Sequence, residues 1–349
     1  MSMDSDELVP NAVFTVDEAP DKERFDVWKE SISCVFDVEA ATDIRKGEFN
    51  ATVDAHILGP VMLARTQTHQ QKWTRSSFNI ARDGMDHYML QLFEHGQMAY
   101  EDSDGTTYVP QQGLVLYDLS QESVSQTDNF TNLSLIIPRT MLEGALKSPD
   151  DQHLRTLHSS EPMVALLRDH MQSLKRQAAN MTVSQSMEIA PATIGLVGAC
   201  LNASISDTPN GLEGVNTALS VMVKRYIENH LLDSNMTPDN IAKAAGISRS
   251  KLYQLFEPLG GVSSYIKERR LRRALSLLVD PHQKHRTILE VALDVGFASD
   301  SDFSRSFKRR YGVSPRDARS LGLPGLTAGQ GDNEALDRRY EQWIRNLSL

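Results

Sequence analysis

The chain of 349 residues contains two cysteines, Cys34 and Cys200, which are too few for a disulfide framework or a Cys-x-x-Cys metal site. We expect both to be buried as small apolar side chains in a reducing compartment. No apolar run approaches the roughly 18–20 residues that would span a bilayer. The N-terminus is acidic and lacks the basic and apolar regions of a signal peptide. The sequence therefore predicts a cytoplasmic protein with no membrane partner.

Sequence signatures of catalysis are missing as well. There is no GxSxG, no phosphate-binding loop and no GxGxxG. A metal-dependent β-barrel enzyme would need a close H-x-H pair, because three ligands must converge on one ion, and no such pair occurs in the strand-rich region. Glu94 and His95 are adjacent and would point to opposite faces of a strand. We expect no catalytic residue, no metal ligand and no cofactor; the metal-dependent enzyme remains the alternative from another functional class.

Charge is unevenly distributed along the chain. Residues 1–215 hold 15 Lys and Arg against 31 Asp and Glu, a net charge of −16. Residues 216–322 hold 18 against 11, a net charge of +7, although the whole chain is at −10. An acidic body joined to a basic C-terminal module is typical of a regulated nucleic-acid-binding protein, and a solvated basic surface is the plainer alternative.

The region from Gly47 to Pro138 contains seven short strand-like segments separated by turn residues, such as HYMLQLFEHG and GLVLYDL. No helical pattern interrupts them, which favours a closed or double-sheet antiparallel barrel. Asp104-Gly105 is a good hairpin turn. A helix is predicted just before, where Phe25, Trp28 and Ile32 recur at helical spacing. The fold class is therefore multidomain α+β, with an N-terminal antiparallel β-barrel flanked by helices.

The last third of the chain contains one pattern twice, from Thr237 to Glu257 (TPDNIAKAAGISRSKLYQLFE) and from Thr287 to Tyr311 (TILEVALDVGFASDSDFSRSFKRRY). Each copy starts at a hydroxyl N-cap, forms a short apolar helix face, turns at a glycine and starts a second amphipathic helix at a serine. This pattern predicts two helix-turn-helix units. A helix over Ser263–Val279 would join them, with its KERRLRR run on the exposed side.

The second helix of each unit would present polar side chains outward. These are Arg249, Ser250, Tyr253 and Gln254 in the first unit, and Asp300, Ser301, Ser304, Arg305, Lys308 and Arg309 in the second. Arginine can bind a guanine edge bidentately and glutamine can pair with adenine in the major groove. A connecting helix can hold two recognition helices about 34 Å apart, one turn of B-DNA. The duplication predicts double-stranded DNA as the partner; a helical bundle with a basic surface is the alternative.

The stretch from Asn216 to about Leu321 resembles the DNA-binding domain of AraC/XylS-type transcription regulators. The resemblance rests on IAKAAGISRSKLYQLF, YIKERRLRRALSLL and ILEVALDVGFASDSDFSRSFKRRYGVSPRDAR. It implies base-facing positions at Ser250, Tyr253, Gln254, Ser301 and Arg305. The chain departs from the family at Glu257-Pro258, where basic residues usually follow, and at Ala318, where an aromatic residue is frequent.

The N-terminal part is similar to the cupin-like sensor domain of the same family, through RFDVWKES, DHYMLQLFEHGQ, GLVLYDLS and LIIPRTML. Such a domain implies a small-molecule effector or dimerisation, and the family implies an activator that works with RNA polymerase. The candidate ligand-binding residues are Arg75, His87, Tyr88 and Gln91. Strand alternation leaves open which set faces the interior, His87, Met89 and Gln91 or Tyr88, Leu90 and Leu92. A regulator without a ligand, controlled by a protein partner, remains the alternative.

Arginine and aromatic residues of the strand region are further candidates for binding an effector. Arg65, Arg75 and Arg82 would suit a carboxylate, and Trp73, Phe78, Tyr100 and Tyr117 an aromatic ring. Each is also compatible with a structural role, the arginines as surface charge and the aromatic residues as barrel core.

These observations predict six segments. They are a poorly ordered acidic N-terminus (1–22), the sensor domain (23–145), a helical segment for homodimerisation (146–206), a linker (207–215), the double helix-turn-helix domain (216–322) and a linker with an amphipathic helix (323–349). The last helix has an apolar stripe of Leu336, Tyr340, Trp343, Ile344 and Leu347 that should not stay in water. We expect it to dock back on the chain or to join a dimer.

Overall fold

The structure is a computed structural model that describes residues 7–102, 105–203, 212–233, 236–321 and 336–347. The chain forms two compact units. The first comprises residues 1–80, 85–204 and 327–349, and the second comprises residues 81–84 and 205–326. Apart from residues 81–84, the second unit is therefore a continuous stretch inserted between the body of the first unit and the C-terminal segment that returns to it.

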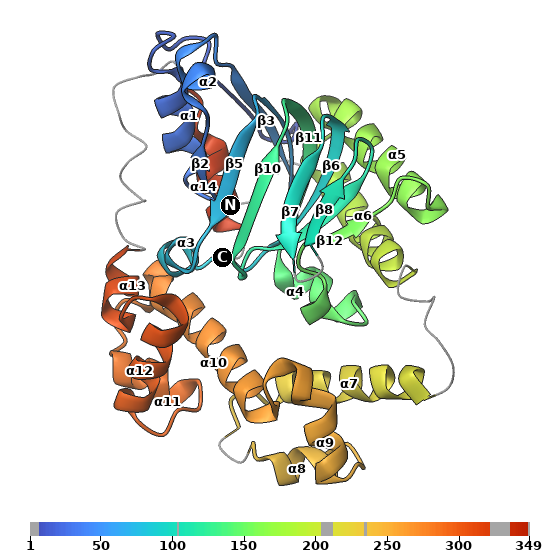
Figure 1. The fold of residues 1–349 in the computed structure, drawn as a ribbon, viewed down its shortest axis with the longest axis vertical. Coiled ribbons are helices and arrows are strands. Elements are labelled where there is room, and N and C mark those ends of the chain that lie inside the picture. The colour runs from blue at the N-terminus through green and yellow to red at the C-terminus, as the bar shows by residue number, and fades with distance from the viewer. Residues whose placement is uncertain (1–6, 103–104, 204–211, 234–235, 322–335, 348–349) are drawn as a thin grey trace. The chain divides into compact units, whose positions relative to one another are not determined.

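Two antiparallel sheets form the body of the first unit (Figure 1). The large sheet has the order β1 (Asn11–Thr15), β3 (Ala51–Leu58), β4 (Val61–Thr68), β11 (Phe130–Ile137), β6 (Tyr88–His95), β9 (Leu114–Asp118) and β12 (Arg155–Leu157). The small sheet has the order β2 (Asp37–Glu39), β5 (Gln71–Arg75), β10 (Ser123–Thr127), β7 (Met98–Asp102) and β8 (Gly105–Val109). The predicted α+β class is confirmed, and of the two predicted arrangements the strands adopt the double-sheet one.

The large sheet is buried on both faces, and each face belongs to a different core. Met89 and Phe93 of β6 point into a core shared with the small sheet and with α1 (Arg24–Ile32). Leu90 and Leu92, on the opposite face of the same strand, belong to a second core. This second core is covered by α4 (Arg139–Leu142), α5 (Pro162–Gln177) and α6 (Val183–Ala203), whose contributions include Leu142, Val164, Leu167, Met171 and Ile194.

Sequence reasoning missed five of the strands: β1, β2, β5, β10 and β12. The prediction that residues 1–22 are poorly ordered is wrong for Asn11–Thr15, because β1 pairs with β3 and buries Ala12 and Phe14. Strand β10 reads SVSQT and carries almost no apolar signal, because its inward side chains Ser123 and Ser125 are polar. The predicted hairpin at Asp104-Gly105 falls partly outside the described residues, but β7 and β8 pair up to Asp102 and Gly105.

The helical segment after the sheets packs on the large sheet. Val164, Leu167, Met171 and Leu174 of α5 face inward, whereas Leu166, which the stripe predicted to be inside, is exposed. Cys200 of α6 is buried, and burial raises the pKa of its thiol to about 11. Cys34 is buried as well, as predicted. No helix among the described residues is both long enough and apolar enough to cross a bilayer.

The tail helix α14 (Arg339–Asn346) docks back on the first unit. Tyr340 and Ile344 are buried in the core between the two sheets, and Leu336, Trp343 and Leu347 pack against its edge. The apolar stripe of the tail is therefore covered by the chain itself, which confirms the prediction that the tail helix docks back on the chain.

Lys175 of α5 attaches that helix to the large sheet. Its Nζ lies 2.8 Å from Oδ2 of Asp54 and 3.0 Å from Nδ1 of His56, and it donates to the Asp54 carbonyl at 2.9 Å. Burial and the neighbouring Lys175 charge hold the pKa of His56 below its ordinary value of 6.5, against the opposing attraction of Asp54. Folding therefore disfavours the protonated form of His56.

This arrangement predicts that acid destabilises the first unit. The unfolded chain binds a proton at His56 near pH 6.5 and the folded chain binds it only at lower pH, so the free energy of unfolding should fall as the pH drops below about 6.5. The pKa values of His153 and His170 are lowered by burial too and add to the slope. Urea unfolding at about pH 7.5 and about pH 5.5 measures it. His56→Gln should reduce the difference, and the exposed His158→Gln should not; an unchanged difference in His56→Gln would refute the assignment.

The second unit consists of helices. They are α7 (Leu212–Asn229), α8 (Pro238–Ala244), α9 (Arg249–Phe256), α10 (Val262–Val279), α11 (Ile288–Asp294), α12 (Asp300–Tyr311) and α13 (Pro315–Leu321). Within this unit the α8–α9 pair and the α11–α12 pair lie at the two ends of α10 (Figure 1). Leu252 and Phe256 of α9 pack with Ile241 of α8 and with Val262 and Tyr265 of α10.

Candidate nucleic-acid interface and ligand cavity

The first helix pair is held by local caps at the residues that its sequence indicates. The Thr237 hydroxyl accepts from the Asn240 amide at 3.3 Å, with Pro238 at the first helical position. The Ser248 hydroxyl accepts from the Lys251 amide at 3.1 Å and starts α9. Gly246 between them has φ +66°, a left-handed conformation that favours glycine. These local signals produce the helix-turn-helix geometry.

The second helix pair also has side-chain N-caps and a glycine turn, and its first cap is reciprocal. Thr287 and Glu290 form a reciprocal capping box at the start of α11. The Ser299 hydroxyl accepts from the Asp302 amide at 3.2 Å and starts α12. Gly296 has φ +85°, and a Cβ there would lie 2.6 Å from Cζ of Arg270. The left-handed conformation favours glycine at this turn, and a larger residue would also have to displace the Arg270 guanidinium.

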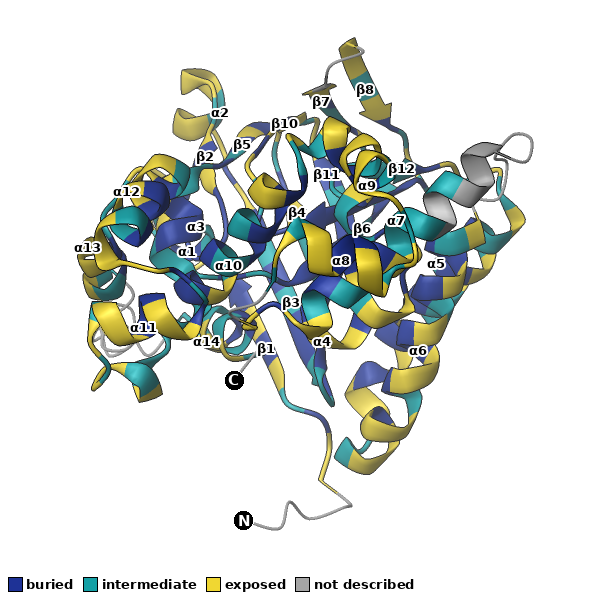
Figure 2. Cartoon of the chain, turned by 90° about the horizontal axis from the view of Figure 1, so that it is seen from below, coloured by how far each residue is buried: buried dark blue, intermediate teal, exposed yellow. Residues whose placement is uncertain are grey.

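All ten predicted DNA-binding residues lie on α9 and α12, at or near the surface. Nine are exposed and Ser304 is half-buried, with its hydroxyl donating to Asp300 at 3.1 Å. Figure 2 shows the buried and exposed sides of these helices. Within α9, Arg249 contacts Asp239 of α8 at 3.1 Å and the Tyr253 hydroxyl at 3.3 Å. Such contacts preset the direction of the guanidinium.

The basic side chains of α12 are differently placed. Among the described residues, no carboxylate pairs with Arg305, Lys308 or Arg309, although the neighbouring Arg310 donates to Glu268 of α10 at 2.6 Å. Helix α12 has 12 residues and α9 has 8, and α9 ends at Phe256 immediately before Glu257-Pro258. The departure from the family pattern at that point therefore does shorten the first recognition helix.

The basic run of α10 is partly structural, which corrects the prediction that it lies on the exposed side. Arg269 is buried and pairs with Glu228 of α7. The Arg270 guanidinium donates to the Leu231 carbonyl at 3.1 Å and to the Gly296 carbonyl at 2.8 Å. Arg270 thereby joins the end of α7 to the turn of the second helix pair. Lys and Arg type alone does not reveal such a role, because their long stems can bury while the head group finds carbonyls.

The first unit contains a cavity between its two sheets, with about 670 Å³ of empty space, part of it open to solvent. Its apolar lining includes Val53, Met62, Met89, Phe93, Phe130 and Ile136 from the large sheet and Trp73 and Met98 from the small sheet. Ile32 at the end of α1 and Tyr340 and Ile344 of α14 complete the wall. These walls enclose a mainly apolar space between the two sheets.

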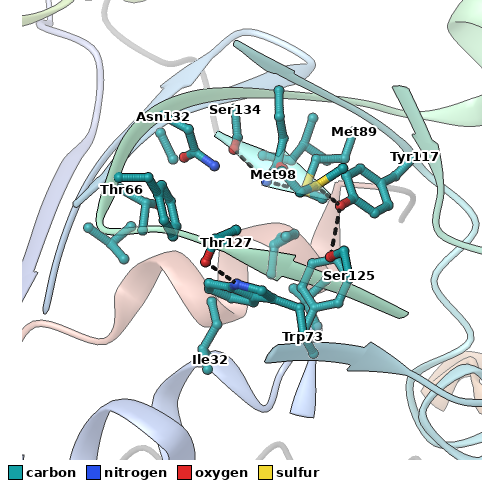
Figure 3. A pocket seen from close by; sticks show the side chains of 18 of the residues that line it. Ile32, Thr66, Trp73, Met89, Met98, Tyr117, Ser125, Thr127, Asn132 and Ser134 are labelled. Atoms are coloured by element: carbon teal, nitrogen blue, oxygen red, sulfur yellow. Dashed lines mark hydrogen bonds between the residues drawn. The ribbon is translucent and has the colours of Figure 1, made fainter. Parts of the chain in front are cut away.

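Polar groups in the cavity are few and neutral (Figure 3). Trp73 Nε1 donates to the Thr127 hydroxyl at 3.0 Å, and Gln91 Nε2 donates to the Ser134 hydroxyl at 3.2 Å. The Tyr117 hydroxyl contacts Met98 Sδ at 2.8 Å, and burial raises its pKa far above the ordinary value. Thr66, Ser125 and Asn132 complete the polar set.

The four predicted ligand residues are not brought together. Gln91 lines the cavity, and the open choice of strand face is thereby resolved in favour of the Met89 and Gln91 side. His87 is on that side but is buried beyond the cavity lining, with Nε2 at 2.9 Å from the Ile344 carbonyl. Tyr88 belongs to the opposite core.

The candidate arginines have structural partners. The buried Arg75 guanidinium donates to the carbonyls of Leu119 at 2.6 Å and of Val35 at 2.7 Å. Arg65 forms a bidentate pair with Glu94, at 2.7 Å and 3.0 Å. Neither belongs to the cavity lining. Of the candidate aromatic residues, Trp73 and Tyr117 line the cavity and Phe78 is exposed.

Two capped helix-turn-helix pairs on one connecting helix define a DNA-binding protein, here combined with a β-rich domain that contains a cavity. The chain matches the AraC-binding-like domain over residues 28–202 and a helix-turn-helix domain over residues 241–320. It is 23% identical over 293 residues to the transcriptional activator NphR of Rhodococcus, covering 82% of this chain and 86% of the relative. It is 34% identical over 97 residues to the XylDLEGF operon transcriptional activator of Pseudomonas putida, covering 27% and 30%.

Among solved structures, the chain is similar to the AraC-like transcriptional activator CuxR, with a TM-score of 0.53 and 24% sequence identity, covering 75% of this chain and 95% of that one. The match to the AraC-binding-like domain spans half of the chain. The protein therefore belongs to the AraC family of transcription regulators, and it is a DNA-binding regulator.

Proposed function

We propose that the second unit reads a specific duplex sequence by placing α9 and α12 in two successive major-groove segments. The observation that carries this proposal is the row of exposed Arg305, Lys308 and Arg309 on α12, which have no carboxylate partner among the described residues. Such cations are available for phosphates and guanine edges. Tyr253 and Gln254 would read bases from α9, and the shorter α9 would contribute less affinity for the DNA backbone.

Arg305→Ala tests this placement. If Arg305 binds a guanine edge, its removal should cost about 1–3 kcal/mol of binding free energy and should relax specificity at that base pair. DNase footprinting on the operator should then show protection lost in one half of the site. Arg316→Ala, an exposed arginine on α13, is the matched control and should leave the pattern unchanged. Uniform weakening across sequences would make Arg305 a phosphate contact and would contradict the role in base reading.

We also propose that the cavity of the first unit binds a small effector that controls DNA binding. The cavity is closed in part by Tyr340 and Ile344, and these residues follow the DNA-binding unit in the chain. A ligand that displaces them would therefore act on the segment that connects the cavity wall to the DNA-binding unit. By analogy with relatives named as transcriptional activators, the regulator would activate transcription with RNA polymerase in the cytoplasm. The alternative is control by a protein partner, which predicts that no small molecule changes thermal stability or promoter affinity.

The exposed side of α6 supports a homodimer. Met187, Ala192, Gly195 and Ala199 are exposed there, on the side that does not cover the sheet. Small and apolar side chains on an exposed helix face allow close approach of a second copy. Sedimentation of the protein with Ala199→Glu would show a monomer if this face is the dimer contact.

A further inference from the structure

Asn132 is the one polar side chain of the cavity lining whose buried oxygen lacks a hydrogen-bond partner among the described residues. It is the third residue of β11, and it is 3% exposed. Its Oδ1 accepts no hydrogen bond. Figure 3 shows the amide among the cavity side chains, on the wall of the large sheet, with Trp73 and Thr127 on the wall of the small sheet. Leaving a buried acceptor unsatisfied is unfavourable, and a bound donor would offset that cost.

The rest of the lining restricts the charge of a ligand. None of the described residues that line the cavity is Asp, Glu, Lys, Arg or His. The nearby arginines are already engaged, since Arg75 donates to the Leu119 and Val35 carbonyls and Arg65 pairs with Glu94. A carboxylate placed here would lose its hydration without gaining a cation, and an unpaired buried charge is strongly disfavoured. The cavity therefore selects against ions of either sign.

The shape of the cavity restricts the ligand further. It lies between two facing sheets, and rings of Phe36, Trp73, Phe93, Tyr117 and Phe130 belong to its walls. The inner side chains of two facing sheets interdigitate, so these rings themselves bound the space. Aromatic walls favour a flat, apolar ring through offset or edge-to-face contacts. Thr66 is in register with Asn132 on the adjacent strand, and its hydroxyl can donate a hydrogen bond to a carbonyl of the same ligand.

We propose that the effector is an uncharged planar molecule, of the aromatic amide or related class, whose N–H or O–H donates to Oδ1 of Asn132. This proposal rests on the cavity being the effector site. It differs from the expectation, based on the sequence, of a carboxylate bound by arginine, because Arg65 and Arg75 already have partners within the protein.

Benzamide, benzoate and toluene are matched probes for this proposal. They share one ring and differ in charge and in the donor group. With the full-length protein, calorimetry should detect benzamide binding and should detect no benzoate binding at neutral pH. Toluene should bind, because it is neutral, but it leaves the Asn132 acceptor unpaired.

Asn132→Leu should reverse the preference between the two neutral probes. Loss of one hydrogen bond weakens benzamide binding by about three- to tenfold, whereas toluene should bind more tightly, because leucine removes the unpaired oxygen. Equal weakening of both probes would mean that Asn132 acts on the cavity through packing and not through a hydrogen bond to the ligand, which contradicts the proposal. The matched control is Asn180→Leu, an exposed position outside the cavity, which should leave all three affinities unchanged.

The remaining outcomes overturn the proposal in different ways. Benzoate binding as strong as benzamide binding would refute the neutral class, while the cavity would stay the effector site. Binding of none of the three probes would refute the neutral planar class, and equal loss of benzamide and toluene in Asn132→Leu would refute the hydrogen bond to Asn132. Footprinting of the same preparations on the operator is independent of these results, so a failure of the DNA-binding proposal would be recognised separately.

Discussion

Arg139→Met is expected to lower the free energy of unfolding of the first unit by about 3–5 kcal/mol, because it leaves the buried charge of Asp118 without its cation. Arg139 is 5% exposed and Asp118 is 1% exposed, and the two form an ion pair. The same guanidinium donates to the Tyr88 hydroxyl at 2.8 Å and to the Asp86 carbonyl at 3.0 Å. It therefore connects α4, β6 and β9 on the helix-covered face of the large sheet.

Thermal unfolding of the full-length protein measures this effect. For a unit of this size the loss corresponds to a decrease of about 6–20 °C in Tm. The control is Arg168→Met, which removes a partly exposed pair with Asp169 on α5 and should cost no more than about 1 kcal/mol. Combining Arg139→Met with Asp118→Asn should recover part of the loss, since no buried charge is then left unpaired. A double variant no more stable than Arg139→Met would mean that packing, and not charge, is what Arg139 contributes.

The helix-turn-helix units could be predicted from the sequence because every signal that specifies them is local. Thr237, Ser248, Thr287 and Ser299 cap helices through bonds to amides three residues away, and Gly296 supplies a turn that other residues resist. Cap and turn chemistry depends on neighbours in the chain and on little else. The ten outward positions could be assigned from the same local geometry, whereas their contacts with DNA still await experiment.

The cavity could not be assigned in the same way, because a strand buried on both faces gives no sign of which side faces the ligand. Tyr88 and Gln91 are both plausible from type, yet they point to different cores. Arginine at position 75 suits an anion by residue type, but its partners are the carbonyls of Val35 and Leu119, 40 and 44 residues away. Asn132 gave no signal, since nothing in the sequence shows that an asparagine in an apolar strand lacks a partner.

Removing the contacts of α14 is expected to have a comparably large effect on stability and an additional effect on ligand control. Tyr340 packs on Phe14 with ring centroids 6.0 Å apart, and its hydroxyl is 2.7 Å from that of Ser31. The Ile344 carbonyl is 2.9 Å from His87 Nε2, and its side chain lines the cavity. Truncating such side chains to alanine costs about 2–5 kcal/mol each, and the two costs need not add.

Ile344→Ala is the sharper of the two variants, because the smaller loss leaves the protein folded while it alters the cavity wall. We expect a lower Tm together with changed affinity for benzamide, whereas Gln342→Ala, exposed on the same helix, should change neither. If α14 carries the signal, the operator affinity of Ile344→Ala should also respond less to benzamide than that of the wild type. The reason is that the DNA-binding unit is joined to the first unit at both of its ends, and α14 anchors one of them against the cavity. If benzamide changes the operator affinity of Ile344→Ala as much as that of the wild type, α14 does not transmit the effect of the ligand. The connection after α6 would then transmit it.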